Sequence, residues 1–313
     1  MTPYLQFRPL YQERVWGGRV LETFLGRKLT GTTPIGESWE LVDRSEAQSV
    51  VAGGPWAGQT LRQLMVNHRA EIMGPAWPKN RPFPILVKWL DCRAPLSVQV
   101  HPPANIAARL GGEPKTENWY FAQAEPGAGV YAGLRMGVTR ESFERALAED
   151  KVDQCLNHLA VHTGDSLLIE SGTMHAIAAG NLILEIQQNS DTTYRVYDWG
   201  RPGLDGKPRA LHVRESLECL NANTAKPPQL ARGEGVLAKC HEFTIRCQEL
   251  RAGERVSFAG GQQPRILSVI QGTLAGGSTF RPGDNLLLPC VSDFALVAQS
   301  DATILVTENF STP

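Results

Sequence analysis

The sequence lacks the features that mark several large classes of protein. Its six cysteines are scattered through 313 residues with no C-x-x-C pair, which argues against a disulfide framework or a cysteine-bound zinc site and favours buried free thiols. No apolar run approaches the roughly 18 residues that a membrane-spanning helix needs, and the N-terminal stretch contains no apolar core of a signal peptide. The pattern therefore predicts a cytoplasmic protein with no membrane partner.

The chain also lacks an excess of charge of either sign. Its 31 Lys and Arg nearly balance its 32 Asp and Glu, for a formal net charge of -1, so no basic field is available to hold nucleic acid. Any anionic substrate must instead meet a local cluster of Lys and Arg. The length and the 42% content of hydrophobic residues suit an enzyme with a substantial core, in one large domain or two smaller ones. The oligomeric state cannot be read from the sequence, and a monomer is compatible with it.

The most informative stretch of the chain is residues 95–120. Residues 97–101 alternate polar and apolar side chains, which is the period of a half-buried strand, and a proline pair ends the run. The alternation places Ser97, Gln99 and His101 on one face of that strand. A hydroxyl, an amide and an imidazole therefore point the same way.

A second alternating run follows a Gly-Gly break and places Lys115 and Glu117 on a common face. If the two runs form adjacent strands that face the same interior, Gln99, His101 and Glu117 converge on one point. An amide, an imidazole and a carboxylate suit a borderline metal such as zinc. The structural alternative is a hydrogen-bonded pair of Gln99 and His101 that holds no metal.

Short strands and a few helices surround this stretch. Helices are predicted to begin after the N-cap residues Thr60 and Thr139 and to cover residues 213–220. A polar turn at residues 43–46 separates two alternating runs. Strands are predicted at residues 37–42, 47–51, 84–91, 243–250, 265–270, 285–288, 294–298 and 303–307. Regularly spaced short strands of this kind in the C-terminal part are typical of a sandwich or barrel.

An internal repeat relates the two halves of the chain. The segment GDSLLIESGTMH at residues 164–175 has a weaker partner, GDNLLLPCVSDF, at residues 283–294. Both contain a Gly-Asp turn, a short apolar strand and a second turn. The spacing resembles the second motif of the cupin barrels, which ends in a metal-binding histidine. His175 stands at that position in the first copy and Phe294 in the second, while Glu170 replaces the usual proline of the motif.

The repeat predicts the fold. We expect a mainly β protein made of two cupin-type jelly-roll barrels with a few flanking helices. Residues 1–225 would form the catalytic, metal-binding barrel, with His175 as its fourth ligand. Residues 226–313 would form a degenerate barrel that lacks metal ligands.

The chain as a whole resembles the type I mannose-6-phosphate isomerases in their short bacterial form, which has no large helical insert. The matching segments extend over almost the whole sequence: ERVWGG, PIGESWEL, FPILVKWLD, LSVQVHP, KTENWY, GDSLLIESGTMHAI and TTYRVYDWGR. The resemblance implies one zinc ion per chain at Gln99, His101, Glu117 and His175. It also implies active-site roles for Arg195, Lys115 and Asp191.

These residue types suit the reaction that the resemblance implies. Interconverting mannose 6-phosphate and fructose 6-phosphate moves a proton between C2 and C1 through an enediolate, whose oxygen charge a Lewis acid and fixed cations stabilise. Arg195 would stabilise enediolate or phosphate charge. Lys115 would bind an oxyanion, or shuttle a proton if neighbouring charge lowers its pKa, and Asp191 is a candidate acid or base. Alternatively, Asp191 and Arg195 pair with each other or with strand neighbours.

Phosphate recognition and two competing functions stay open on the sequence alone. Ser97, Lys88 and Arg209 are candidates for contacts with the phosphate. An iron-dependent cupin dioxygenase is one alternative function, and a non-catalytic cupin that binds sugar phosphates is another. The amide ligand and the nearby cations suit an anionic sugar better than an oxygen-binding iron. The presence of both Lys115 and Arg195 argues for catalysis.

Overall fold

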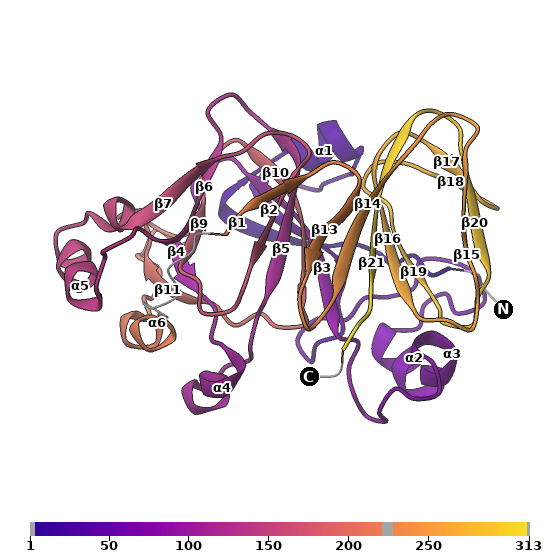
Figure 1. The fold of residues 1–313 in the computed structure, drawn as a ribbon, viewed down its shortest axis with the longest axis horizontal. Helices are drawn as coiled ribbons and strands as arrows, with labels where there is room; N and C mark the ends of the chain where they lie inside the picture. The colour runs from indigo at the N-terminus through magenta and orange to yellow at the C-terminus, as the bar shows by residue number, and fades with distance from the viewer. Residues whose placement is uncertain (1–3, 221–227, 312–313) are drawn as a thin grey trace.

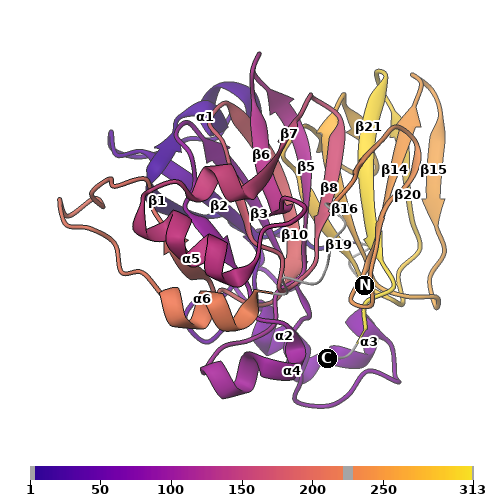
Figure 2. The same cartoon turned by 60° about the vertical axis from the view of Figure 1, so that its left-hand side comes forward.

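The computed structural model describes residues 4–220 and 228–311, whose strands form two barrels side by side (Figure 1). In the first barrel a seven-stranded sheet faces a five-stranded sheet. In the second, a five-stranded sheet faces a four-stranded one. The mainly β, two-barrel architecture predicted from the internal repeat is confirmed. The two barrels keep this arrangement in the turned view of Figure 2.

The strands have the following order and bounds. The seven-stranded sheet contains β1 (Leu10–Gly18), β2 (Ile35–Leu41), β3 (Ile85–Cys92), β10 (Asn181–Gln188), β5 (Glu117–Ala124), β8 (Asp165–Ile169) and β12 (Leu230–Arg232). The sheet that faces it contains β11 (Tyr194–Tyr197), β4 (Val98–Val100), β9 (His175–Ile177), β6 (Gly129–Leu134) and β7 (Leu156–Ala160). The larger sheet of the second barrel contains β13 (Gly235–Lys239), β14 (Thr244–Leu250), β21 (Ala302–Glu308), β16 (Arg265–Gln271) and β19 (Asn285–Leu288). Its smaller sheet contains β15 (Arg255–Phe258), β20 (Phe294–Ala298), β17 (Leu274–Ala275) and β18 (Thr279–Phe280).

Short helices cover the barrels. They are α1 (Val20–Leu25), α2 (Leu61–Asn67), α3 (Arg69–Met73), α4 (Ala104–Ala107), α5 (Arg140–Ala148) and α6 (Val213–Cys219), with 3-10 turns η1 (Ala108–Leu110) and η2 (Val152–Cys155). The predicted caps are confirmed, because the hydroxyls of Thr60 and Thr139 accept hydrogen bonds in capping boxes. Figure 1 shows α2 and α3 below the second barrel and α5 and α6 beside the first. None of the helices within the described ranges is long and apolar enough to cross a membrane.

The alternation along each strand separates a packing face from a functional face. On β3, Val87 and Trp89 point outward into the apolar cluster shared with the second barrel, whereas Lys88 lines a cavity inside the first barrel. On β4, Val98 and Val100 pack outward against a cluster that includes residues of α5 and α6. Side chains at the intervening positions therefore face the interior of the barrel.

The internal repeat appears as matching strands. The first copy forms β8 and β9, and the second forms β19 and β20 at equivalent places in the second barrel. Phe294 is 5% exposed and lies in the apolar core of that barrel, with its ring centroid 6.2 Å from that of Phe280. The predicted boundary between residues 225 and 226 falls outside the described residues and stays a prediction. Beyond it in sequence, β12 pairs with β8 of the first barrel.

Two expectations from the sequence are wrong. β4 and β5, expected to be adjacent, belong to opposite sheets of the first barrel, because alternation determines which face a side chain occupies but not which strand lies next to it. Residues 47–51 form isolated bridges, Asp43 with Gln48 and Val50 with Thr60, instead of a strand.

Candidate metal centre and active-site cavity

Two rows of residues, one on each sheet of the first barrel, define the candidate site. On the seven-stranded sheet, Glu185 of β10 lies directly opposite Lys88 of β3. On the five-stranded sheet, Gln99 of β4 lies between His175 of β9 and Arg195 of β11. Because the inner faces of two packed sheets point toward each other, both rows face the same interior.

Three side chains that can bind a metal converge between these rows. His101 Nε2 lies 3.4 Å from Oε2 of Glu117, and His175 Nε2 lies 3.3 Å from Oε1 of the same carboxylate. Their ligand atoms all lie within 4.8 Å of one another, and residues 4–220 and 228–311 contain no other such group of His, Cys, Asp and Glu. All three side chains are buried. The predicted convergence of Glu117 with the two histidines is therefore present.

The two imidazoles are oriented by main-chain carbonyl groups. Nδ1 of His101 donates to the carbonyl of Thr192 at 2.8 Å, and Nδ1 of His175 donates to the carbonyl of Thr173 at 2.8 Å. A neutral imidazole that donates from Nδ1 has a lone pair on Nε2. Both Nε2 lone pairs therefore point at the carboxylate of Glu117, which is the arrangement that a metal ligand requires.

Gln99 reaches the same point with its amide. Its Nε2 lies 3.3 Å from Nε2 of His175, while its Oε1 accepts a hydrogen bond from the Ser97 hydroxyl at 3.2 Å. The amide oxygen, expected from the sequence to face the rings, thus points toward Ser97. An amide has nearly the same shape in its two orientations, and a half-turn places the oxygen beside His175 without moving the chain.

The surroundings of these residues fit a bound cation. Oε1 of Glu117 is buried and has no hydrogen-bond partner among the described residues, and leaving such an oxygen unpaired is costly. Four ligands at about 2.0–2.2 Å from a tetrahedral zinc lie roughly 3.3–3.6 Å apart, and the two distances from imidazole Nε2 to the carboxylate of Glu117, 3.4 and 3.3 Å, fall in this range.

Protonation states agree with that fit. Burial lowers the pKa of His175 to about 3, and it also lowers the pKa of His101. Burial alone would raise the pKa of Glu117, but Lys115 and the two imidazoles overcome this effect and bring that pKa well below its usual value. Neutral imidazoles and an ionised carboxylate are the forms that bind metal.

A cavity of about 550 Å³ opens beside this centre. The sequence-predicted residues Ser97, Gln99, Lys115, Asp191 and Arg195 all line it. The cavity is thus large enough to accept a small ligand next to the ligand cluster, and its lining combines cationic and anionic side chains.

Arg195 presents a cation to this cavity. Its Nε donates to the Ser97 hydroxyl at 3.2 Å and its Nη1 to the carbonyl of Ala210 at 3.0 Å. Within the described part of the chain it forms no ion pair with a carboxylate, so the alternative that Arg195 pairs with Asp191 is not found. Burial and the neighbouring Arg209 lower the pKa of Arg195. An anion bound to this guanidinium would compensate for its lost solvation and for its repulsion by Arg209.

Lys115 lies next to the ligand cluster but is not poised as a base. Its Nζ is 2.6 Å from Oε2 of Glu117, 3.3 Å from Nε2 of His101 and 3.8 Å from Oε1 of Glu185. Burial would lower the pKa of Lys115, yet the two carboxylates outweigh burial and raise it. The condition for proton shuttling by Lys115, a lowered pKa, is therefore not met.

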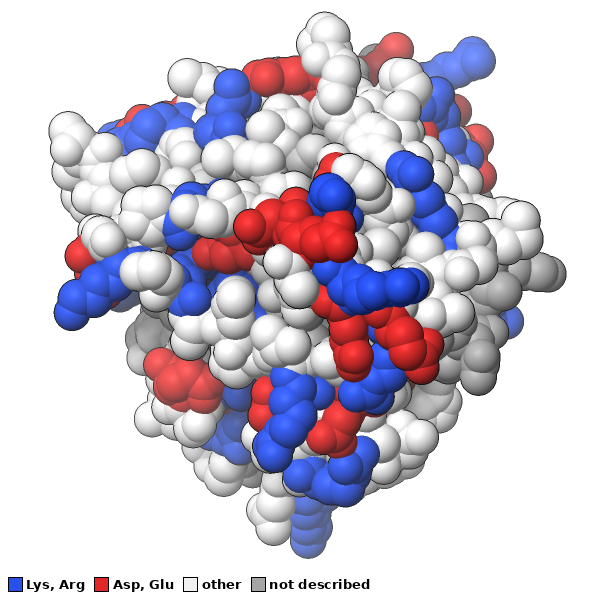
Figure 3. Space-filling view, turned by 90° about the vertical axis from the view of Figure 1, so that its left-hand side faces the viewer, with Lys and Arg blue, Asp and Glu red and all other residues white. Residues whose placement is uncertain are grey.

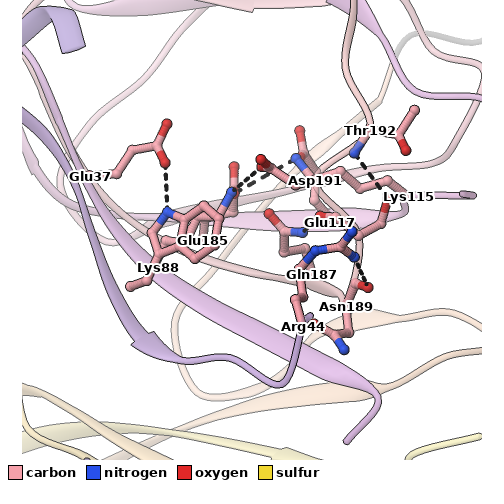
Figure 4. A network of polar contacts seen from close by, with 12 residues as sticks. Glu37, Arg44, Lys88, Lys115, Glu117, Glu185, Gln187, Asn189, Asp191 and Thr192 are labelled. Carbon is pink, nitrogen blue, oxygen red and sulfur yellow. Dashed lines mark hydrogen bonds and ion pairs between the residues drawn. The ribbon is translucent and has the colours of Figure 1, made fainter. Parts of the chain in front are cut away.

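Asp191 and Glu185 both pair with Lys88. The Lys88 Nζ lies 3.5 Å from Oδ1 of Asp191 and 3.7 Å from Oε1 of Glu185, and Figure 4 shows these side chains together. Asp191 has a side chain 44% exposed, whereas that of Glu185 is 6% exposed. Burial raises the pKa of Glu185 to about 7, although Lys115 and Lys88 oppose the shift.

Comparisons with known proteins agree with this arrangement. The family model described as "Phosphomannose isomerase type I, catalytic domain" matches residues 4–128. The mannose-6-phosphate isomerase ManA of Bacillus subtilis is 35% identical over 302 residues, which cover 92% of this chain and 93% of that protein. The mannose-6-phosphate isomerase of Streptococcus mutans is 36% identical over 290 residues, covering 88% of this chain and 89% of that protein. The chain belongs to the type I phosphomannose isomerase family.

Solved structures of this family have the same fold. The crystal structure of the Bacillus subtilis mannose 6-phosphate isomerase superposes with a TM-score of 0.84 at 27% identity, covering 98% of this chain and all of that one. The apo mannose 6-phosphate isomerase of Salmonella typhimurium gives a TM-score of 0.74 at 16% identity, with 99% and 100% covered, which bears on the fold alone. Family members are aldose–ketose isomerases, so neither the dioxygenase nor the non-catalytic alternative is favoured.

Five charged residues that line this cavity were missed from the sequence: Glu13, Arg14, Glu37, Glu185 and Asp205. Of these, Glu37 accepts hydrogen bonds from Arg14 at 2.9 and 3.1 Å and from Trp39 Nε1 at 2.7 Å. Glu185 could have been recognised from the sequence as a candidate site residue. It lies within the apolar run of β10, and a charge inside a buried strand requires a partner. The pairing of Arg14 with Glu37 across two strands had no such local signal.

The remaining phosphate candidate is already paired. Arg209 lines the cavity of this family member, but its Nε donates to Oδ2 of Asp198 at 2.6 Å, and Arg201 contacts the same carboxylate at 3.0 Å. On the face shown in Figure 3, basic and acidic side chains are interspersed over the surface. Inside the cavity, the cations available to an anionic substrate include Lys88, Lys115 and Arg195.

Proposed function

We propose that the protein interconverts mannose 6-phosphate and fructose 6-phosphate through an enediolate and uses one zinc ion per chain. The observation that carries the proposal is the meeting of His101, Glu117 and His175 beside a cavity lined by Lys and Arg side chains. Family membership supports the choice of substrate, because relatives that span most of the chain are named mannose-6-phosphate isomerases.

Gln99, His101, Glu117 and His175 would hold the ion. Two imidazoles, a carboxylate and an amide oxygen form a donor set that zinc accepts. When bound there, the ion supplies Lewis acidity that polarises the carbonyl group of the sugar and stabilises negative charge on oxygen. The other steps belong to side chains around the cavity.

Arg195 is the proposed binder of the developing oxyanion or of the phosphate. It stays charged at any working pH, and its Nε and Nη1 are held by Ser97 and by the carbonyl of Ala210. A fixed cation costs little reorganisation when charge appears in the transition state. Ser97 would act mainly by orienting this guanidinium, with a direct contact to substrate as its second role.

The carbon-bound proton requires a base. A base removes the C2 proton of the aldose and leaves an enediolate with its charge on O1. O1 then gains a proton as O2 loses its hydroxyl proton, and protonation of C1 gives the ketose. Glu185 is the better-placed base, because its buried carboxyl group faces the cavity and its pKa of about 7 allows it to take and return a proton near neutral pH. Asp191, more exposed and beside Lys88, is proposed to serve the transfer between oxygens.

Lys115 is proposed as a fixed cation. Its ammonium group already contacts Glu117 and lines the cavity, so it can bind a substrate oxygen or offset carboxylate charge. The direction of its pKa shift argues against the role of base.

An assay on metal-stripped protein tests the proposal. Protein treated with a chelator is expected to form no fructose 6-phosphate from mannose 6-phosphate, and added zinc should restore turnover. Folded, zinc-loaded protein without isomerase activity would overturn the proposal. Recovery with iron and consumption of oxygen would instead identify a dioxygenase, and tight substrate binding without turnover would identify a binding protein.

A further inference from the structure

Arg44 contacts two segments that carry site residues, although it lies outside the cavity. Its Nη1 donates to the carbonyl of Asn189 at 2.7 Å and to Oε2 of Glu113 at 2.7 Å. Asn189 begins the segment 189–192, and Glu113 begins the segment 113–117. Figure 4 shows Arg44 beside Asn189 in the polar network that reaches the site. One guanidinium thus joins two segments far apart in the sequence.

The segment 189–192 controls the orientation of a metal-ligand candidate. The carbonyl of Thr192 accepts the Nδ1 hydrogen bond of His101, and this bond selects the tautomer whose Nε2 lone pair faces the site. Asp191, which lines the cavity, belongs to the same segment. Any shift of this segment therefore moves both an orienting carbonyl group and a charged side chain of the cavity.

The segment 113–117 carries the carboxylate of the centre. It ends at Glu117, and it is joined to the other segment by two neutral hydrogen bonds. The main-chain N–H of Glu113 donates to Oγ1 of Thr192 at 3.0 Å, and Oγ of Ser190 donates to the carbonyl of Glu113 at 3.3 Å. Arg44 adds a third connection, because its guanidinium forms an ion pair with Glu113 and donates to the carbonyl of Asn189.

The turn that bears Arg44 is itself held firmly. Its main-chain N–H donates to the carbonyl of Ala47 at 3.0 Å. The preceding residue, Asp43, is fully buried and accepts hydrogen bonds from Arg62 Nε at 2.7 Å and from the N–H of Phe83 at 2.7 Å. The Arg44 side chain is 15% exposed. The main chain at Arg44 is therefore fixed on the core, and its side chain is largely shielded from solvent.

We propose that Arg44 is a positioning residue of the metal centre. It keeps the segment 189–192, whose Thr192 carbonyl orients His101, at the correct separation from the segment 113–117, which ends at Glu117. The inference rests on the metal centre of the proposed function. Outer groups that orient metal ligands typically change metal affinity by about 10–100-fold when they are removed. A purely structural ion pair would change stability without changing metal affinity.

Metal affinity of folded variants tests this role. We expect Arg44→Ala to raise the zinc dissociation constant about tenfold or more, measured by competition with a chromophoric chelator. Arg44→Lys should give a smaller rise, because one ammonium group contacts fewer acceptors than a guanidinium. Cobalt-substituted Arg44→Ala should also show an altered absorption spectrum, since His101 is no longer held in one orientation.

Arg246→Ala is the matched control, because Arg246 forms an exposed ion pair with Glu308 in the second barrel at 3.0 Å. A zinc dissociation constant within twofold of that of the unchanged protein in Arg44→Ala, or an equal rise in the control, would overturn the role. If Arg44→Ala does not fold, the affinity of Arg44→Lys decides in the same way.

The outcome is separable from that of the proposed function. If the unchanged protein binds zinc but shows no isomerase activity, the proposed function fails while the effect of Arg44 on affinity can still be measured. If the protein is an active zinc isomerase and Arg44→Ala leaves the affinity unchanged, the positioning role alone fails.

Discussion

Oε1 of Glu117 lies 3.3 Å from Nε2 of His175, although the two residues come from opposite sheets of the first barrel. Nothing in the described chain donates a hydrogen bond to this oxygen. A cation between the two atoms would therefore satisfy a buried group and link the sheets at once. The ion would act as a cross-link of the barrel as well as a Lewis acid.

Removal of the Glu117 carboxylate should abolish metal binding. We expect Glu117→Ala to contain less than about a tenth of the zinc of the unchanged protein and to be inactive, with zinc content measured by elemental analysis. Zinc at 100 times its dissociation constant should stabilise the unchanged protein by about 2.7 kcal/mol and should leave the variant unaffected. Glu125→Ala, which removes an exposed partner of Arg93, is the control. A fully zinc-loaded Glu117→Ala would contradict the assignment.

Removal of Arg195 should separate metal binding from turnover. Arg195→Ala should keep its zinc, because the guanidinium contacts Ser97 and Ala210 rather than the histidines. Its kcat should fall by about 10²–10³-fold, as for loss of one donor to a developing oxyanion. A variant that loses zinc, or that keeps full kcat, would refute the role. If KM for the sugar phosphate rises while kcat holds, Arg195 binds the phosphate rather than the enediolate.

Glu185 should determine the acid limb of the pH–rate profile. Because the pKa of Glu185 is raised to about 7 and a base must be deprotonated, turnover should increase with pH up to that region and then level off. Glu185→Gln should lose about 10²–10⁴-fold in kcat and lose this limb. Steady-state rates at pH 5 to 9 provide the measurement. An unchanged limb in Glu185→Gln would contradict the role of Glu185 as the base.

The faces of the site strands could be predicted from the sequence, but not their partners. Alternation over residues 97–101 correctly placed Gln99 and His101 opposite two buried valines, because a strand has a strict period of two. The same alternation does not indicate which strands are neighbours in a sheet or which lie on the opposite sheet of the barrel. The chain passes through α4 and η1 between β4 and β5, and this connection takes it from one sheet to the other.

Long-range ion pairs were also beyond sequence reasoning. Lys88 and Glu185 interrupt apolar strands, so each could be recognised as a buried charge in need of a partner. Their pairing became visible only through the register of β3 and β10. Arg44 was recognisable only as part of a polar turn, since its acceptors other than the neighbouring Glu46 lie in distant segments.

The buried carboxyl group of Asp91 should make stability depend on pH in an unusual direction. Burial raises its pKa from 3.8 to about 6, although Oδ2 accepts a hydrogen bond from the N–H of Val20 at 2.6 Å. The folded state therefore keeps this proton to a higher pH than the unfolded state. The contribution of Asp91 to stability is full below pH 4 and is lost as pH rises through about 6.

Asp91→Asn should remove that pH dependence. The difference in urea midpoint between the variant and the unchanged protein, both with chelator, should grow in favour of the variant from pH 4 to pH 7 and then stay constant. Other carboxyl groups titrate equally in both proteins and cancel. A difference that does not change with pH would show that Asp91 has an ordinary pKa in the folded state.

Truncation of Phe294 should damage stability without touching the metal centre. Its ring lies in the core of the second barrel opposite Phe258 and 5.3 Å from the ring of Tyr4, at the place where the first barrel has His175. Phe294→Ala should cost about 3–5 kcal/mol in free energy of unfolding, and Phe294→Leu less than about 1.5 kcal/mol, both by urea denaturation. The zinc dissociation constant of each folded variant should match that of the unchanged protein. Since Phe294 belongs to an apolar cluster and the described residues place no group of metal ligands in this barrel, Phe294→His should lower stability and bind no second zinc ion. A zinc content of two per chain would contradict the loss of metal chemistry in this barrel.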